Sequence, residues 1–168
     1  LLAIMALGTV TDFRGLPGLY EHALPFKNLA DAVGLRNHLI HVLEEASIET
    51  DPALRKELLT FVIAGGGFSG VECAADLNDF LRDISRRHYN TVEPKDVRVI
   101  LLHSQDRVLP EVSEKLGRFA QKIMEKRGVE IWFKCRLERA TKTEAILSDG
   151  RRIPTRTRRR TRTSRTTR

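Results

Sequence analysis

Apolar residues follow two patterns along the chain. Short continuous runs, typical of strands buried on both faces, lie at Leu1 to Leu7 and Phe61 to Ala64, and the mainly apolar segments Val97 to Leu102 and Val129 to Phe133 predict two further strands. Stretches with helical spacing lie between these runs, at residues 28 to 43, 68 to 87 and 110 to 127. Strands that alternate with helices predict β-α-β units, a parallel sheet and an α/β fold.

Capping and turn residues refine these elements. Asn28 and Asp51, the second followed by Pro52, are expected to cap two helices at their N-termini. Residues 11 to 27 are rich in Gly and Pro, which predicts a connecting loop.

The C-terminal part of the chain predicts one more helix and, after it, a change from strand–helix alternation to short antiparallel strands. Residues 135 to 154 consist of short alternating segments with a tight turn at Asp149-Gly150, which predicts a small antiparallel flap. The helix after Pro110 is expected to carry one apolar face, formed by Val112, Leu116, Phe119, Ala120 and Ile123.

Charge is unevenly distributed over the 168 residues. The net charge of +7 arises from seven Arg within residues 155 to 168, a segment without acids; the 22 basic residues elsewhere balance 22 acidic ones. This Arg/Thr segment is expected to be disordered, and no nucleic acid partner is expected for the neutral remainder. With 41% hydrophobic residues the chain is expected to be soluble and to form a packed core.

No metal site is expected. Cys73 and Cys135 form no C-x-x-C pair, which favours a reducing compartment over a metal knuckle or a local dithiol. His38 and His41 lie three residues apart on a predicted helix without a third ligand nearby, so they are expected to be solvated.

The chemistry of the chain is concentrated in a glycine-rich turn. Gly65-Gly66-Gly67-Phe68-Ser69-Gly70 matches G-x-G-x-x-G, follows a predicted strand and opens a predicted helix. Gly65 would allow the sharp turn, Gly67 a close approach of a pyrophosphate, and Gly70 the packing of helix on strand. Free N–H groups at the helix start would then bind the phosphates of a dinucleotide. A plain connecting turn is the alternative.

The ribose-binding position is occupied by histidine. An Asp or Glu at the end of the second strand usually accepts hydrogen bonds from the adenosine ribose, and His103 stands there instead. A neutral His can still bind a hydroxyl, and no Arg follows at once to receive a 2′-phosphate. NADH is therefore favoured over NADPH.

The stretches Ile63 to Glu72 and Asp106 to Pro110 resemble the two-dinucleotide-binding-domain flavoproteins. Ala6-Leu7-Gly8 is similar to the segment that ends a strand of their FAD domain. Residues 15 to 40 are similar to the linker of type II NADH dehydrogenases, the single-subunit NADH:quinone oxidoreductases.

The resemblance implies three regions and two cofactors. Residues 1–58 would be a remnant of an FAD domain with linker helices, 59–154 an incomplete Rossmann-like NAD(H)-binding domain, and 155–168 the disordered tail. NADH would give hydride to FAD, and the flavin would reduce a quinone at the membrane. Residues 65 to 70 would bind NADH, and Ala6, Leu7 and Gly8 would approach FAD.

Glu72 has two alternative interpretations. The resemblance places it near the nicotinamide and the flavin as the catalytic residue. Alternatively, it is an acid in the first turn of a helix, favoured there by the helix dipole.

The resemblance also implies a setting for the intact protein. That protein would be cytoplasmic, peripheral on the inner membrane and able to form a homodimer. The chain begins without Met and lacks the family's first FAD-binding glycine motif and its membrane anchor, so we expect a fragment that is inactive alone. The alternatives are a ferredoxin- or rubredoxin-type reductase, a non-catalytic dinucleotide-binding module, and a polyanion binder acting through Arg156 to Arg168.

Overall fold

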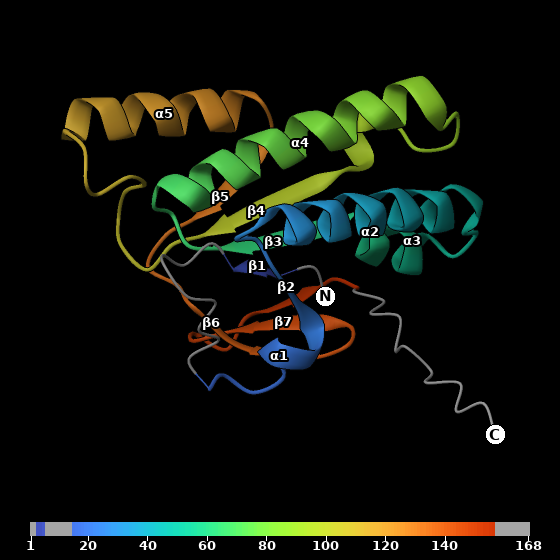
Figure 1. Ribbon diagram of the computed structural model, residues 1–168, viewed down its shortest axis with the longest axis horizontal. Coiled ribbons are helices and arrows are strands. Elements are labelled where there is room, and N and C mark those ends of the chain that lie inside the picture. Colours follow the sequence, from blue (N-terminus) through green and yellow to red (C-terminus); the bar gives the residue numbers. More distant parts are fainter. Residues whose placement is uncertain (1–2, 6–14, 157–168) are drawn as a thin grey trace.

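A parallel five-stranded sheet lies at the centre of the chain in a computed structural model, which describes residues 3–5 and 15–156 (Figure 1). Its strand order is β2-β1-β3-β4-β5, and all four pairings are parallel. The strands are β1 (Ala3–Met5), β2 (Ala23–Pro25), β3 (Thr60–Ala64), β4 (Arg98–Leu102) and β5 (Val129–Trp132). The predicted α/β fold is confirmed.

Two layers cover this sheet (Figure 1). The helices α2 (Leu29–Ile48), α4 (Phe68–His88) and α5 (Glu114–Lys126) lie on one side of it, with the short α3 (Pro52–Leu58) beside α2. On the other side lie α1 (Leu19–His22) and a second sheet. That sheet is the expected antiparallel flap, formed by β6 (Leu137–Ala140), β7 (Glu144–Leu147) and β8 (Arg152–Pro154).

The two central strands are buried on both faces along the apolar segments Phe61–Ile63 and Val99–Leu102. Phe61 and Ile63 of β3 belong to the core under the helices, whereas Val62 between them belongs to the core under the flap. The same alternation holds for Leu101 and Ile100 of β4, and all five side chains are at most 1% exposed. A period of two therefore divides each strand between two separate cores.

Both predicted helix caps are present. Asn28 accepts a hydrogen bond from the Asp31 N–H at 2.9 Å, and the Asp31 carboxylate accepts one from the Asn28 N–H, which completes a capping box. Asp51 accepts from Ala53 N–H at 2.9 Å, with Pro52 at the first helical position of α3.

The prediction of a plain loop over residues 11–27 is wrong for its described part. Residues 19–25 form α1 and β2, and the 3-10 helix η1 (Pro94–Asp96) is a further short element. Leu19 is fully buried, and Gly18 lies so close to the Ala140 carbonyl that a side chain there would collide with it. These short elements depend on contacts that are distant in sequence, so local propensity does not predict them.

The orientation of α5 also differs from the prediction. The helix begins at Glu114, and it leaves Leu116, Phe119 and Ile123 exposed while burying Gly117 and Met124. A Cβ at Gly117 would lie 2.9 Å from the Val108 carbonyl oxygen. The helix therefore packs on its glycine side, because only that side allows so close an approach to the preceding loop.

Trp132 joins the flap to the main sheet. The guanidinium of Arg151, which follows the Asp149-Gly150 turn, lies 4.5 Å from the centre of the indole ring, and that of Arg98 lies 5.8 Å from it. Such cation–π contacts hold the turn against the end of β5.

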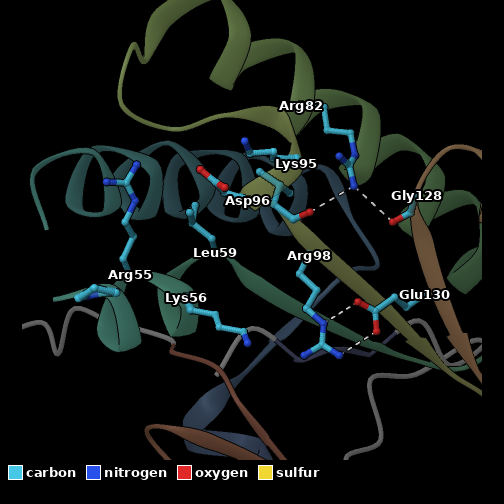
Figure 2. Close-up of a pocket in the computed structure, with 11 residues that line it drawn as sticks. Arg55, Lys56, Leu59, Arg82, Lys95, Asp96, Arg98, Gly128 and Glu130 are labelled. Carbon is cyan, nitrogen blue, oxygen red and sulfur yellow. Dashed lines mark hydrogen bonds and ion pairs between the residues drawn. The ribbon is translucent and has the colours of Figure 1, made fainter. Parts of the chain in front are cut away.

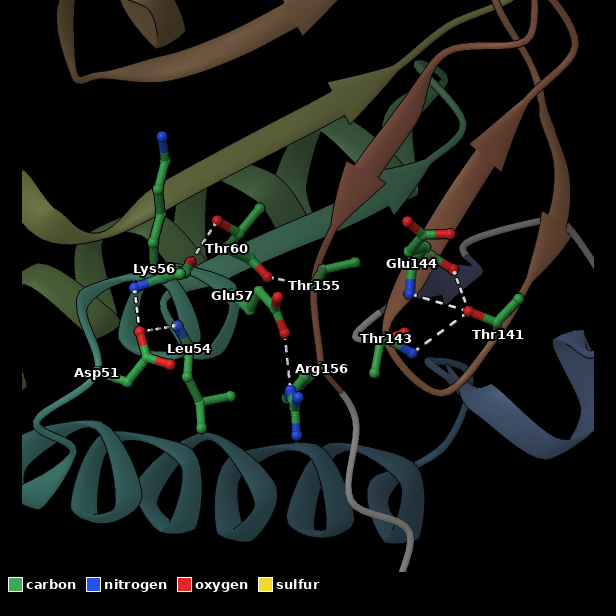
Figure 3. A network of polar contacts seen from close by, with 11 residues as sticks. Asp51, Leu54, Lys56, Glu57, Thr60, Thr141, Thr143, Glu144, Thr155 and Arg156 are labelled. Carbon is green, nitrogen blue, oxygen red and sulfur yellow. Dashed lines mark hydrogen bonds and ion pairs between the residues drawn. The ribbon is translucent and has the colours of Figure 1, made fainter.

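The chain beyond β8 is fixed for two more residues (Figure 3). The Thr155 hydroxyl donates to the Thr60 carbonyl at 2.6 Å, and Arg156 forms an ion pair with Glu57 at 2.7 Å. The tail expected to be disordered therefore has two ordered residues at its start, and residues 157–168 lie outside the described part. The division at residue 58 stays a prediction; β1 and β2 extend the same sheet as β3.

None of the helices within residues 15–156 combines the length and the apolar character that a membrane-spanning helix needs.

Candidate functional site

The glycine-rich turn joins β3 to α4 at the carboxyl end of the sheet (Figure 1). Gly65 has a φ of +119°, which side chains rarely adopt. Gly70, in the first turn of α4, lies so close to the Gly65 carbonyl oxygen that a Cβ would overlap with it. The turn thus requires glycine at both positions, once for the backbone conformation and once for packing.

Three backbone amides at this turn are free for a ligand. The Gly65 and Gly66 N–H groups donate to the Leu102 carbonyl at 2.9 Å and to His103 Nδ1 at 3.1 Å. The N–H groups of residues 67 to 69 have no acceptor within the described residues, and Gly67 is the N-cap of a 21-residue helix. Unpaired amides at a helix N-terminus favour an anion such as a phosphate.

Gly67 faces the open part of this site. A Cβ added there would meet only the Glu111 Oε1 atom, at 3.5 Å, which is ordinary contact. The absence of a side chain at this position therefore serves no packing need within the described chain. It leaves room for a group that approaches the backbone closely.

His103 stands directly after β4 and packs against the turn. Its Nδ1 accepts the Gly66 N–H, so the neutral ring carries its proton on Nε2. The ring is 8% exposed, and Nε2 is buried without a partner in the described structure. Burial lowers the pKa of His103 and keeps it neutral. Because Nε2 is buried next to the Arg107 backbone, a ribose hydroxyl at the end of β4 would reach this donor after a small displacement of the ring or its neighbours.

Glu111 belongs to the site, although its sequence position gives no sign of it. The Leu109 N–H donates to the Gly66 carbonyl at 2.8 Å, and Leu109 adopts a φ of +52°. This contact brings the following residues to the turn and places the Glu111 carboxylate beside Gly67. The sequence predicts Glu111 in a helix, whereas α5 begins three residues later.

Of the remaining predicted site residues, some are exposed near the turn and others lie outside the described part of the chain. Glu72 is exposed on α4, and the first turn of this helix contains no acid. The dipole explanation for Glu72 is therefore wrong, because α4 begins at Phe68 and Glu72 lies in its second turn. Phe68 and Ser69 are exposed beside the free amides. Ala6, Leu7 and Gly8 lie outside the described residues.

Comparison with known proteins agrees with this geometry. The family model for pyridine nucleotide-disulphide oxidoreductases matches residues 3–158. The chain belongs to this family.

Its relatives confirm the resemblance to type II NADH dehydrogenases. The chain is 33% identical over 151 residues to the external alternative NADH-ubiquinone oxidoreductase of Yarrowia lipolytica, covering 88% of the chain and 26% of the relative. It is 35% identical over 128 residues to the type II NADH:quinone oxidoreductase NdhA of Mycobacterium tuberculosis, covering 76% of the chain and 27% of the relative. The chain thus spans about a quarter of the length of these relatives.

A solved structure shares the fold. The NDH2 of Plasmodium falciparum, solved in complex with NADH, superposes with a TM-score of 0.81 at 17% identity. The match covers 92% of this chain and 32% of that one. The Rossmann-like interpretation of the strand, turn and helix is confirmed at the level of fold.

The family name refers to disulphide chemistry. The two cysteines of this chain are poorly suited to such chemistry. Cys73 and Cys135 are both free and buried. Burial raises the pKa of Cys73 to about 12 and also raises that of Cys135. Each is a neutral thiol at physiological pH, whereas thiol–disulphide exchange needs a thiolate.

The two helix histidines differ from the expectation that both are solvated. His38 is largely buried, and burial lowers its pKa from 6.5 to about 4, whereas His41 is exposed and lies 3.9 Å from Glu44. Within residues 15–156, no three side chains of the metal-binding types gather in one place.

His38 makes stability depend on pH. Between pH 6.5 and 4 the unfolded chain binds a proton at His38 that the folded chain does not, so stability falls as pH falls through this range. We expect a loss of about 2 kcal/mol between pH 7 and pH 5 from this group, measured by urea unfolding. H38Q should remove most of this loss, and the matched variant H41Q should keep it; equal pH profiles for H38Q and the parent chain would contradict the assignment.

Proposed function

We propose that the chain is the NADH-binding part of a flavin-dependent NADH dehydrogenase, in which hydride passes from NADH to FAD and on to a quinone. The observation that carries the proposal is the set of three free amides at the N-terminus of α4. The names of the relatives from Yarrowia and Mycobacterium, both NADH:quinone or NADH-ubiquinone oxidoreductases, support the choice of reaction.

Each part of the turn has a role in this proposal. The amides of Gly67, Phe68 and Ser69 bind the pyrophosphate of NADH, and the bare backbone at Gly67 allows its close approach. His103 Nε2–H donates to a ribose hydroxyl. Gly65 and Gly70 shape the turn, and Gly66 ties it to His103.

The flavin side of the reaction rests on the family. FAD, when bound, accepts the hydride and passes electrons to the quinone. The backbone of Ala6 to Gly8 is the proposed FAD contact, and the exposed Glu72 is the proposed residue near the nicotinamide. The intact protein would be peripheral on the cytoplasmic face of the inner membrane and would form a homodimer.

Calorimetric titration of the purified chain with NADH and with NADPH tests the proposal. We expect saturable binding of NADH and weaker binding of NADPH. A chain that is folded by circular dichroism and binds neither nucleotide would overturn the dinucleotide assignment, and with it the function.

Glu111 is expected to reinforce the preference for NADH. Its carboxylate lies beside Gly67 and interacts electrostatically with His103, where the ribose that carries the additional phosphate of NADPH is proposed to lie, so this charge repels NADPH more strongly. We expect E111Q to raise the affinity for NADPH relative to NADH by about three- to tenfold. E114Q, which removes a charge on α5 instead, is the control; an unchanged ratio in E111Q would place the nucleotide elsewhere.

A further inference from the structure

A cavity lies at the end of the main sheet opposite the glycine-rich turn (Figure 2). It measures about 510 Å³ and is formed where β3, β4 and β5 begin, with Leu59, Arg98 and Gly128 at these three points. The glycine-rich turn instead follows the end of β3. The volume of the cavity is within the range of small-molecule sites. The cavity and the glycine-rich turn are separated by the length of the strands.

The walls of this cavity are strongly basic. Five cations and two acids, Asp96 and Glu130, line it; the cations are Arg55, Lys56, Arg82, Lys95 and Arg98. Residues 1–154 as a whole are neutral, so this concentration of positive charge is local.

The acids in the cavity are already engaged. Glu130 accepts two hydrogen bonds from Arg98, at 2.5 and 2.8 Å, and these lower its pKa, with a smaller contribution from Lys56. The Asp96 carboxylate accepts the Glu93 N–H at 3.1 Å in a capping box. Glu130 offsets the charge of Arg98 and Asp96 offsets one further charge, so the five cations and two acids leave an excess of three positive charges around the cavity.

Among the described residues, Arg82 has no counter-charge in direct contact. Its guanidinium donates to the carbonyls of Pro94, Val97 and Gly128 and to the Asn78 side chain, at 2.5 to 3.3 Å. These are neutral acceptors, and they use four of the five guanidinium N–H groups. The side chain is fixed in place, its charge faces the cavity, and one donor remains.

Arg55 and Lys56 supply the charges that are free to close on a ligand. Both project from α3, and Lys56 extends toward the Arg98–Glu130 pair (Figure 2). Neither has an ion-pair partner among the described residues. Lys95, by contrast, contacts Glu93 at 2.8 Å.

We propose that this cavity is a second anion site, which binds a small molecule carrying two or more phosphate or carboxylate groups. Rigid Arg82 forms its wall, and Arg55 and Lys56 close on the ligand. Several cations around a concave surface favour a multiply charged anion over a single one, because each added charge gains a separate contact.

Pyrophosphate and citrate are the probes for this proposal. Each is titrated into the whole chain by calorimetry at low ionic strength, and a preference for one identifies phosphate or carboxylate as the natural group. We expect the double variant R55Q/K56Q to weaken binding by about tenfold or more. The control K115Q/K122Q removes the same charge from α5 and should change affinity by less than about twofold.

A third variant separates this site from the dinucleotide site. G67A should retain binding of the probe, because it changes only the glycine-rich turn. The proposal is overturned if neither probe binds the folded parent chain, if R55Q/K56Q binds as well as its control, or if G67A abolishes binding. Failure of NADH to bind would leave these three results unaffected.

Discussion

The G67A variant is expected to weaken NADH binding by about tenfold or more while changing the free energy of unfolding by less than about 1 kcal/mol. Gly67 has a φ of −78°, which alanine adopts freely, and its added methyl group would make only ordinary contact with Glu111. The methyl group would instead stand where the pyrophosphate approaches the free amides.

Gly70 provides the contrasting variant. In G70A the new Cβ would overlap with the Gly65 carbonyl oxygen, and both atoms belong to rigid elements, β3 with its turn and the first turn of α4. We expect a loss of about 2 to 3 kcal/mol of stability together with loss of NADH binding. Urea unfolding and NADH titration of both variants test the pair. Full NADH affinity in G67A would contradict the proposed pyrophosphate site, and a stable G70A would contradict the packing of the turn.

Replacement of Arg82 by methionine is expected to cost about 2 kcal/mol of stability. One guanidinium satisfies three carbonyls, which belong to η1, to the residue before β4 and to the residue before β5. Methionine would fill much of the same volume but remove the donor from the part-buried Pro94 and Val97 oxygens, at about 1 kcal/mol each, whereas water can replace it at the exposed Gly128 oxygen. Gly128 has a φ of +93° and lies directly against Arg82, since a Cβ added at Gly128 would be 2.7 Å from the Arg82 Nη2 atom.

The control for Arg82 lies one turn further along α4. Arg86 is exposed, so R86M should change the unfolding free energy by less than about 0.5 kcal/mol in the same urea titration. Similar losses in both variants would show that helix propensity or net charge, rather than the carbonyl contacts, determines the effect.

The elements that sequence predicted correctly are those whose local pattern matches their environment. β3 and β4 are apolar after their first residues, Thr60 and Arg98, because both faces are buried there, and Asn28 and Asp51 carry their capping groups within a few residues. Gly65 and Gly70 have requirements for glycine that arise inside the motif itself. Such features depend on residues that are close in sequence, so the sequence alone predicts them.

The features that the sequence did not predict depend on distant contacts. Nothing near Glu111 indicates that the Leu109–Gly66 hydrogen bond brings its carboxylate to the turn. His103 was expected to face the ribose, but its Nδ1 is used by the Gly66 amide 37 residues earlier, which leaves only Nε2 for a ligand. The burial of α5 on its Gly117 side likewise follows from the path of the preceding loop.

The contact between the flap and the main sheet has a practical consequence. Trp132 is the only tryptophan of the chain, and Arg151 of the flap lies against its ring. The fluorescence of Trp132 is therefore expected to change when the contact between the two sheets is lost. If the flap detaches before the helices melt, emission and far-ultraviolet circular dichroism will change at different denaturant concentrations.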